Sequence, residues 1–163
     1  MSEQQATIGP VLGRIPSGIV ILSARGPAGE QTGMLASWVQ QASFEPAAVS
    51  VAVNNKRYIN DWLQTDANVG LSLVGESQKN LLSHFGKGFE PGQPAFEGLA
   101  TATTPAGITV LANAMGWLAG QVVNSVNAGD HTVYVVQLTH GSPAATIETE
   151  KPFVHIRKNG FGY

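Results

Sequence analysis

The chain contains no cysteine, which excludes disulfide bonds, thiolate nucleophiles and cysteine-ligated metal centres. Charge is also scarce, with 9 Lys and Arg and 11 Asp and Glu among 163 residues and a net charge of -2. The absence of any cationic run argues against nucleic acid and anionic membranes as partners. No apolar run approaches the ~20 residues that span a bilayer. Because the polar, acidic N-terminus is unlike a signal peptide, we expect a cytoplasmic protein.

Several catalytic patterns are missing as well. The glycine-rich segment 86–92 is only loosely similar to a dinucleotide-binding turn, and it follows an expected helix rather than a strand. No phosphate-binding P-loop and no nucleophile elbow is visible. The four histidines lack the spacing of metal ligands, so we expect no metal site; they are His84, His131, His140 and His155.

What is present is a length that suits one domain, residues 1–163, with a real core. The chain is 43% hydrophobic and only 12% charged, so few polar side chains are available to cover its surface. Extended exposed apolar patches are unfavourable for a monomer in water. We therefore expect an oligomer.

Runs of β-branched and apolar residues between turn formers predict a mainly β chain. Strands are expected at 18–24, 31–39, 48–53, 68–74, 98–103, 108–111, 115–126, 131–139 and 152–157. Short helical segments are expected at 6–16, 59–63 and 76–86. Several strands are apolar on both faces, which is typical of a closed or covered sheet. This favours a β-barrel with a few short helices over a sandwich, and the lack of long alternating helices disfavours a doubly wound fold.

The uncharged stretch that runs from Thr32 towards Pro46 mixes hydroxyls, adjacent amides, small residues and large apolar residues. Small residues let a ligand approach the backbone, polar groups can fix it, and apolar side chains can cover its flat faces. The alternative is a plain strand that turns a corner at 42–46. In the strand at 48–53, Ala48, Ser50 and Ala52 share a small face, which predicts close packing by another strand or a planar ligand.

Two further groups extend this candidate site. The cation pair Lys56 and Arg57 can bind a phosphate. His131 begins a strand after a turn at Gly129 and Asp130, which makes it a candidate donor at a barrel rim. Asp130 and His131 are adjacent in an expected strand start, so we expect their side chains to point apart. A solvated surface charge is the alternative for Arg57, and a strand-end histidine bonded to backbone is the alternative for His131.

The segment T-G-M-L-A-S-W-V-Q-Q-A-S-F-E-P, residues 32–46, resembles the signature of flavin reductase-like proteins with the FMN-binding split-barrel fold. It is most similar to the flavin reductase module of cyanobacterial flavodiiron proteins. Other segments resemble the same family in the same order, so that the similarity covers nearly the whole chain. They are 13–24, 51–59, 85–98, the Gly129-Asp130-His131 turn, and the ending that contains His155, Arg157, Lys158, Gly160 and Tyr163.

The resemblance implies a homodimer that holds FMN at the rim of each barrel and reduces flavin with NAD(P)H. Transferred onto this sequence, it places Ser37 at the phosphate or ribityl chain, Arg57 at the phosphate and His131, as the catalytic position, on the nicotinamide side. The implied cofactor-binding residues are Met34, Leu35, Ala36, Ser37, Trp38, Ala42, Ser43, Phe44, Lys56 and Arg57. Two departures affect the phosphate end: Asn55 stands where the family often has lysine, and Ala47 where most relatives have proline.

Two functions from different classes follow from the resemblance. The first is an FMN-containing NAD(P)H:flavin oxidoreductase, which transfers a hydride from nicotinamide C4 to flavin N5. The second is an FMN-binding electron-transfer or carrier module without NAD(P)H activity of its own, which serves an electron-acceptor protein. A split barrel that binds another cofactor, such as haem, or none, is a third interpretation.

Overall fold

The computed structural model describes residues 2–162 of the chain, so Tyr163 of the family-like ending lies outside the described residues. The strands are β1 (Ser17–Gly18), β2 (Val20–Arg25), β3 (Gln31–Ala36), β4 (Val39–Phe44), β5 (Ala47–Asn54), β6 (Asn68–Leu73), β7 (Thr101–Thr103), β8 (Thr109–Leu111), β9 (Gly116–Asn127), β10 (His131–Pro143) and β11 (Val154–His155). The helices are α1 (Glu3–Leu12) and α2 (Lys79–Gly86), and η1 (Tyr58–Trp62) is a 3-10 turn. The mainly β prediction is confirmed.

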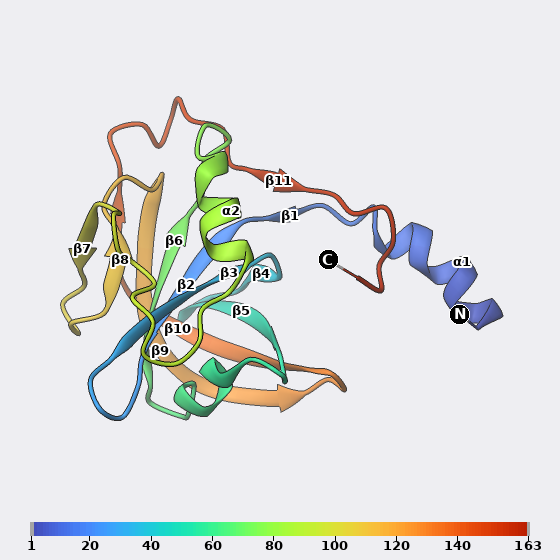
Figure 1. Cartoon of the computed structure of the whole chain (residues 1–163), viewed down its shortest axis with the longest axis horizontal. Coiled ribbons are helices and arrows are strands. Elements are labelled where there is room, and N and C mark those ends of the chain that lie inside the picture. Colours follow the sequence, from blue (N-terminus) through green and yellow to red (C-terminus); the bar gives the residue numbers. More distant parts are fainter. Residues whose placement is uncertain (1, 163) are drawn as a thin grey trace.

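The main sheet is antiparallel and curls into a barrel that stays open along one side (Figure 1). Its hydrogen-bonded order is β3-β2-β6-β9-β10-β5-β4, and β3 and β4 at its two ends do not pair with each other within residues 2–162. These two strands are consecutive in the chain, joined only by Ser37 and Trp38. The predicted split barrel is therefore confirmed, and its opening lies between β3 and β4.

Strands β2 and β6 are buried on both faces because a hydrophobic cluster lies on each side of the sheet. Leu22 and Leu71 belong to the cluster inside the barrel, whereas Ile21 belongs to a second cluster around Phe85 of α2. Alternate residues of a strand face opposite sides, so neighbouring apolar residues supply both clusters. The apolar residues on both faces of these strands indicated a covered sheet. The cover on the outer face is α2 and the loop that follows it.

The strand expected at 31–39 is shorter than predicted, and the expected corner at 42–46 is largely strand. β3 ends at Ala36, and β4 then runs along β5, with Gln40 opposite Ser50. The carbonyl of Trp38 accepts the N–H of Ala52 at 3.0 Å, so the chain has already crossed to β5 at this point. The turn itself is confined to Glu45 and Pro46, which share a cis peptide bond.

Helix boundaries also differ from the sequence expectation. α1 begins at Glu3 rather than at residue 6, because Ser2 caps it: the Ser2 hydroxyl accepts the N–H of Gln5 at 3.2 Å, and the Gln5 side chain accepts the N–H of Ser2 at 3.0 Å. α2 begins at Lys79 rather than at residue 76. None of the helices in the described part of the chain has the length and apolar character needed to span a membrane.

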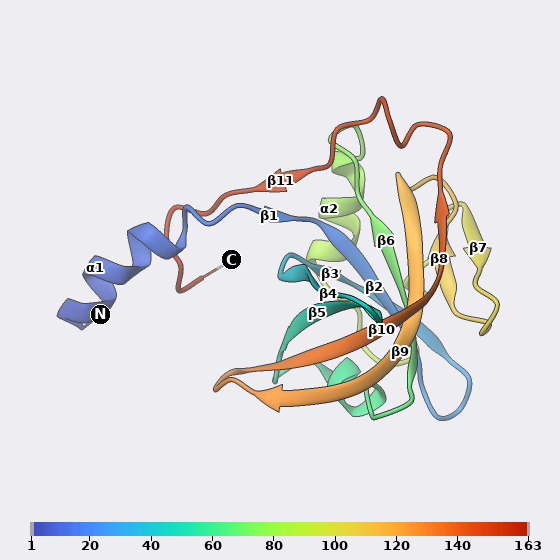
Figure 2. The same cartoon turned by 180° about the vertical axis from the view of Figure 1, so that it is seen from behind.

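Residues 2–18 and 154–162 form a projecting arm beside the barrel (Figure 2). β1 pairs with β11 in the arm, with Ser17 opposite His155. Beyond this pair, the carbonyl of Gly13 accepts the N–H of Arg157 at 2.9 Å, and the carbonyl of Gly9 accepts the N–H of Gly160 at 2.8 Å. The two ends of the chain therefore support each other outside the barrel.

Candidate functional site

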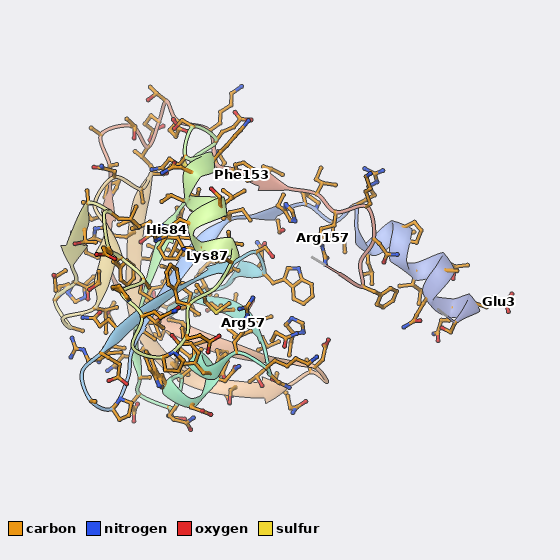
Figure 3. The ribbon with its side chains drawn as sticks, in the orientation of Figure 1. Glu3, Arg57, His84, Lys87, Phe153 and Arg157 are labelled. Carbon is orange, nitrogen blue, oxygen red and sulfur yellow. The ribbon has the colours of Figure 1, made fainter. Side chains whose placement is uncertain are left out.

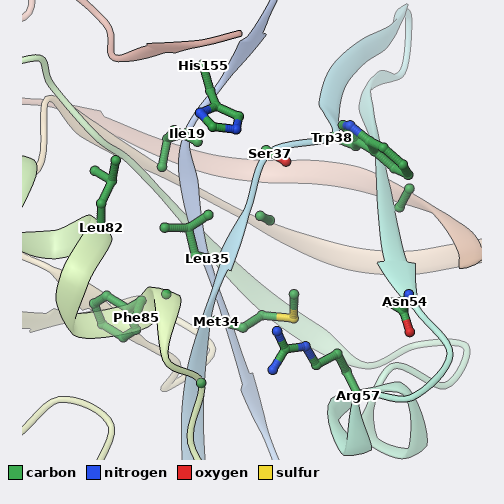
Figure 4. Close-up of a pocket in the computed structure, with 14 residues that line it drawn as sticks. Ile19, Met34, Leu35, Ser37, Trp38, Asn54, Arg57, Leu82, Phe85 and His155 are labelled. Carbon is green, nitrogen blue, oxygen red and sulfur yellow. The ribbon is translucent and has the colours of Figure 1, made fainter. Parts of the chain in front are cut away.

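A cavity of about 280 Å³ lies at the opening of the barrel (Figure 4). The end of β3 and the link to β4 line it with Met34, Leu35, Ala36, Ser37 and Trp38. α2 and the loop after it contribute Leu82, Phe85, Gly86 and Gly88, and the remaining wall residues are Ile19, Ala52, Asn54, Arg57 and His155. This volume is close to the lower end of the range for small-molecule pockets.

The cavity has an apolar middle and polar ends. Met34, Leu35 and Phe85 line its middle, while Arg57 lies at one end and His155 at the other (Figure 4). Ser37, which is buried, adds a hydroxyl between them. Such a lining suits a ligand with a flat apolar body and an anionic group at one end.

Arg57 lies in a loop that is fixed by hydrogen bonds. The side-chain amide of Asn60 donates to the carbonyls of Asn54 and Arg57 at 2.8 and 2.7 Å, and its oxygen accepts the hydroxyl of Tyr134 at 2.9 Å. The Arg57 guanidinium itself makes no hydrogen bond or ion pair with any residue from 2 to 162. The loop thus holds a cation at the cavity with its donors available to an anion.

Gly88 brings the loop after α2 close to this cation. Its φ is +75°, a conformation that strains residues other than glycine. A Cβ built on Gly88 would also lie only 2.7 Å from Nη1 of Arg57. Glycine at position 88 therefore leaves room for the Arg57 guanidinium.

Asn55, one of the departures from the family pattern, fastens the same loop to the turn before β10. Its Nδ2 donates to the carbonyl of Gly129 at 2.9 Å, and its Oδ1 accepts the hydroxyl of Thr132 at 2.8 Å. Its backbone N–H donates to the carbonyl of Asp130 at 2.9 Å. The neighbouring Lys56 is exposed and does not line the cavity, so Arg57 alone of the predicted cation pair faces it.

The expectation that Asp130 and His131 point apart is wrong. Nδ1 of His131 lies 2.8 Å from Oδ1 of Asp130, and this hydrogen bond lowers the pKa of the Asp130 carboxyl. The irregular turn before β10 frees Asp130 from strand alternation, so its side chain can swing back. The His131 ring is buried and packs on Trp38, with ring centroids 4.7 Å apart. It supports a wall residue of the cavity rather than lining the cavity itself.

The structure divides the sequence-predicted residues into two groups. Those that line the cavity are Met34, Leu35, Ala36, Ser37, Trp38 and Arg57, and those that do not are Ala42, Ser43, Phe44, Lys56 and His131. The β4 residues lie away from it because β4 follows β5 along the edge of the sheet, and Phe44 is 88% exposed. Ala52, in contrast, does line it, and it belongs to the small face of its strand, where either another strand or a planar ligand was expected to pack.

The arm reaches the cavity through two residues of its C-terminal segment. His155 lines the cavity directly. The guanidinium carbon of Arg157 lies 5.1 Å from the centroid of a Trp38 ring, within the range of a cation–π contact. Figure 3 shows Arg157 on the arm and Arg57 on the barrel. Trp38 therefore contacts both the barrel, at His131, and the arm.

Residues 12–161 match the family model described as the flavin reductase like domain. The chain belongs to this family. Diflavin flavoprotein A 1 of Synechocystis sp. (strain PCC 6803) is 36% identical over 154 residues, which cover 93% of this chain and 26% of that protein. The chain thus spans about a quarter of the length of the curated relatives it matches, at 28% and 26% for two of them.

Solved structures of flavin reductases share the fold. The styrene monooxygenase flavin reductase of Pseudomonas putida S12 superposes with a TM-score of 0.73 at 27% identity, covering 96% of this chain and 93% of that one. The NADH:FAD oxidoreductase of Streptomyces globisporus C-1027 superposes with a TM-score of 0.81 at 20% identity, covering 90% and 85%. The resemblance read from residues 32–46 is thereby confirmed at the level of family and fold.

Proposed function

We propose that the chain binds FMN in the cavity at the barrel opening and reduces flavin with NADH or NADPH. Membership of the flavin reductase-like family supports the flavin, and the S. globisporus oxidoreductase, also solved with NAD and FAD fragments, supports the nicotinamide nucleotide. The observation that carries the proposal is an apolar cavity that ends at a cation, Arg57, without a protein partner among residues 2–162. One cation at one end suits the single phosphate of FMN.

In this proposal the wall of the cavity binds and orients the rings. Met34, Leu35 and Phe85 exclude water from the flat faces, Ser37 hydrogen-bonds the ribityl chain or phosphate, and Arg57 pairs with the phosphate. Bound flavin would supply the two-electron chemistry, as the acceptor at N5 of a hydride from nicotinamide C4. The chain's part is to hold two rings in contact, which needs no protein acid or base. Through Trp38, His131 shapes the nicotinamide side.

The test is anaerobic mixing of the flavin-loaded protein with NADH and, separately, with NADPH. We expect the visible absorption of oxidised flavin to bleach with at least one nucleotide. Titration with FMN and with FAD, followed by quenching of free flavin fluorescence, then decides between the two flavins. Arg57→Ala should weaken FMN binding, whereas Lys56→Ala, a change of the neighbouring exposed cation, should weaken it less.

The coverage of the relatives favours a second candidate. Because this chain corresponds to only about a quarter of the diflavin flavoproteins, the related segment is joined to other parts in those proteins. The chain would then be an FMN-binding carrier that passes electrons to an acceptor protein. Flavin that stays oxidised with both nucleotides, yet is reduced by a partner protein or dithionite, would favour the carrier.

We also propose that the functional form is a homodimer. The arm exposes large apolar side chains that the barrel does not cover: Val11, Ile15, Val154 and Ile156 are 71%, 60%, 55% and 52% exposed. A second copy would bury them, in keeping with the low charge of the surface. Sedimentation should show a dimer, and Ile156→Asp should shift it to monomer. Thr103→Asp on β7, on the far side of the barrel from the arm, should leave the dimer intact (Figure 1).

A further inference from the structure

The C-terminal segment of the arm turns its polar side chains inward and its apolar side chains outward. Val154 and Ile156 are 55% and 52% exposed, whereas His155 and Arg157 are half-buried. Alternate residues of an extended segment face opposite sides. A segment that served only to pack would bury its valine and isoleucine and expose its histidine and arginine. Packing on the barrel of the same chain therefore does not explain the inward position of the histidine and the arginine.

The two inward side chains end in different places. Arg157 lies over Trp38 and donates to the carbonyl of Gly160 at 3.4 Å. His155 instead projects into the cavity near Ser37 and Ile19 (Figure 4). Its ring makes no hydrogen bond or ion pair with any side chain or carbonyl of residues 2–162. Both ring nitrogens are thus available to a ligand in the cavity.

The backbone around His155 is held in place on both sides. His155 is paired with Ser17 in the β1–β11 ribbon, and two residues later the N–H of Arg157 donates to the carbonyl of Gly13 at 2.9 Å. A histidine on a fixed backbone presents its ring at a defined point of the cavity. That point lies at the end opposite Arg57 (Figure 4).

We infer that His155 is a ligand-contacting residue, whose imidazole hydrogen-bonds the polar edge of the planar ring system bound in the cavity. The inference rests on the proposed function: with the phosphate at Arg57, the ring system extends towards His155. A neutral imidazole donates through one nitrogen and accepts through the other, so it can meet a ring carbonyl or a ring N–H. The arm is then part of the binding site.

Riboflavin and FMN, which differ only in the phosphate, separate the two ends of the cavity. His155→Ala should weaken binding of both flavins by the same factor, about 3- to 10-fold, as expected for one net hydrogen bond. Arg57→Ala should weaken FMN alone, by about tenfold or more. His155→Gln, which keeps a donor and an acceptor, should recover part of the loss. His140→Ala, a change of an exposed histidine of β10 outside the cavity, should leave both affinities unchanged.

The outcomes separate this inference from the proposed function. Wild-type affinity of His155→Ala for both flavins would overturn the role of His155 while leaving flavin binding intact. A loss confined to FMN would overturn it too, because it would place His155 at the phosphate. If the wild-type chain binds neither flavin, the proposed function fails and the inference fails with it. Thermal unfolding of each variant checks that the loss of affinity is not a loss of fold.

Discussion

Replacing Gly88 with alanine perturbs the Arg57 end of the cavity without touching Arg57 itself. Gly88 has a φ of +75°, and a Cβ there would lie 2.7 Å from Nη1 of Arg57. The new methyl group must displace the guanidinium, since the arginine is the flexible partner. Gly86 is a matched control two residues away: it also lines the cavity, has no positive φ, and has open space at its Cβ position.

Gly88→Ala has two effects with separate magnitudes: backbone strain at residue 88 and displacement of the Arg57 guanidinium. A left-handed conformation costs an alanine about 1–2 kcal/mol, which for a chain of this size lowers the melting temperature by about 2–8 °C. Displacing Arg57 from a phosphate removes a charge-assisted hydrogen bond of about 1.5–3 kcal/mol. That loss corresponds to about 10- to 150-fold weaker FMN binding. Gly86→Ala, at the end of α2, should raise the melting temperature slightly, because alanine favours helix.

The assay is thermal unfolding together with FMN and riboflavin titrations of both variants. Gly88→Ala should unfold at a lower temperature than Gly86→Ala and should lose affinity for FMN, with riboflavin affinity largely kept. Equal unfolding temperatures of the two variants would refute the strain argument. Equal weakening of FMN and riboflavin by Gly88→Ala would refute the assignment of Arg57 to the phosphate.

Three other predictions concern the core, the acid response and the nicotinamide side. Phe85 is 2% exposed, so Phe85→Ala should lower the free energy of unfolding by about 3–5 kcal/mol and the melting temperature by about 6–20 °C. An equally small fall in melting temperature for Phe85→Ala and Phe85→Leu would contradict this. The N–H of Ser77 donates to the Glu150 carboxylate and lowers the pKa of that carboxyl in the folded protein. The stability that this contact contributes is therefore present above the ordinary pKa of a glutamate and is lost as the pH falls through the lowered pKa of the folded state. Melting temperatures between about pH 6 and 3 should fall less steeply for Glu150→Gln. His131→Ala should raise the KM for the nicotinamide nucleotide through Trp38 with little change in kcat, and a fall in kcat alone would count against it.

The strands were predictable where local composition and packing agree. The Val-rich run at 48–53 became β5, since alternate Val side chains enter the barrel core. The run at 131–139 became the first part of β10, since Tyr134 and Val136 enter the same core. β4 was missed because its exposed amides and small side chains do not alternate with apolar ones. Its strand conformation comes from pairing with β5, which a local pattern does not contain.

The candidate site was predictable on the β3 side and not on the arm side. Met34 to Trp38 carry a compact local signal, and Arg57 closely follows the Val-rich run at 48–53. His155 is brought to the cavity by pairing with Ser17, a residue 138 positions earlier in the chain (155 minus 17). The alternation of Val154, His155 and Ile156 was visible in the sequence, but only the structure shows which face is inward. For the same reason the Asp130–His131 contact depended on a turn geometry that the residue order alone does not specify.

The two-residue link between β3 and β4 sets a mechanical limit on the barrel. From Ala36 to Val39 the chain makes three steps, which span at most about 11 Å when fully extended. At the link, therefore, the edges of the sheet cannot separate further than that, whatever enters between them. The opening between β3 and β4 can therefore widen only with increasing distance from Ser37 and Trp38. A ligand that pushed β3 outwards, away from the β5 residues across the cavity, would thus strain the β3–β4 link before it disturbed the closed side of the sheet.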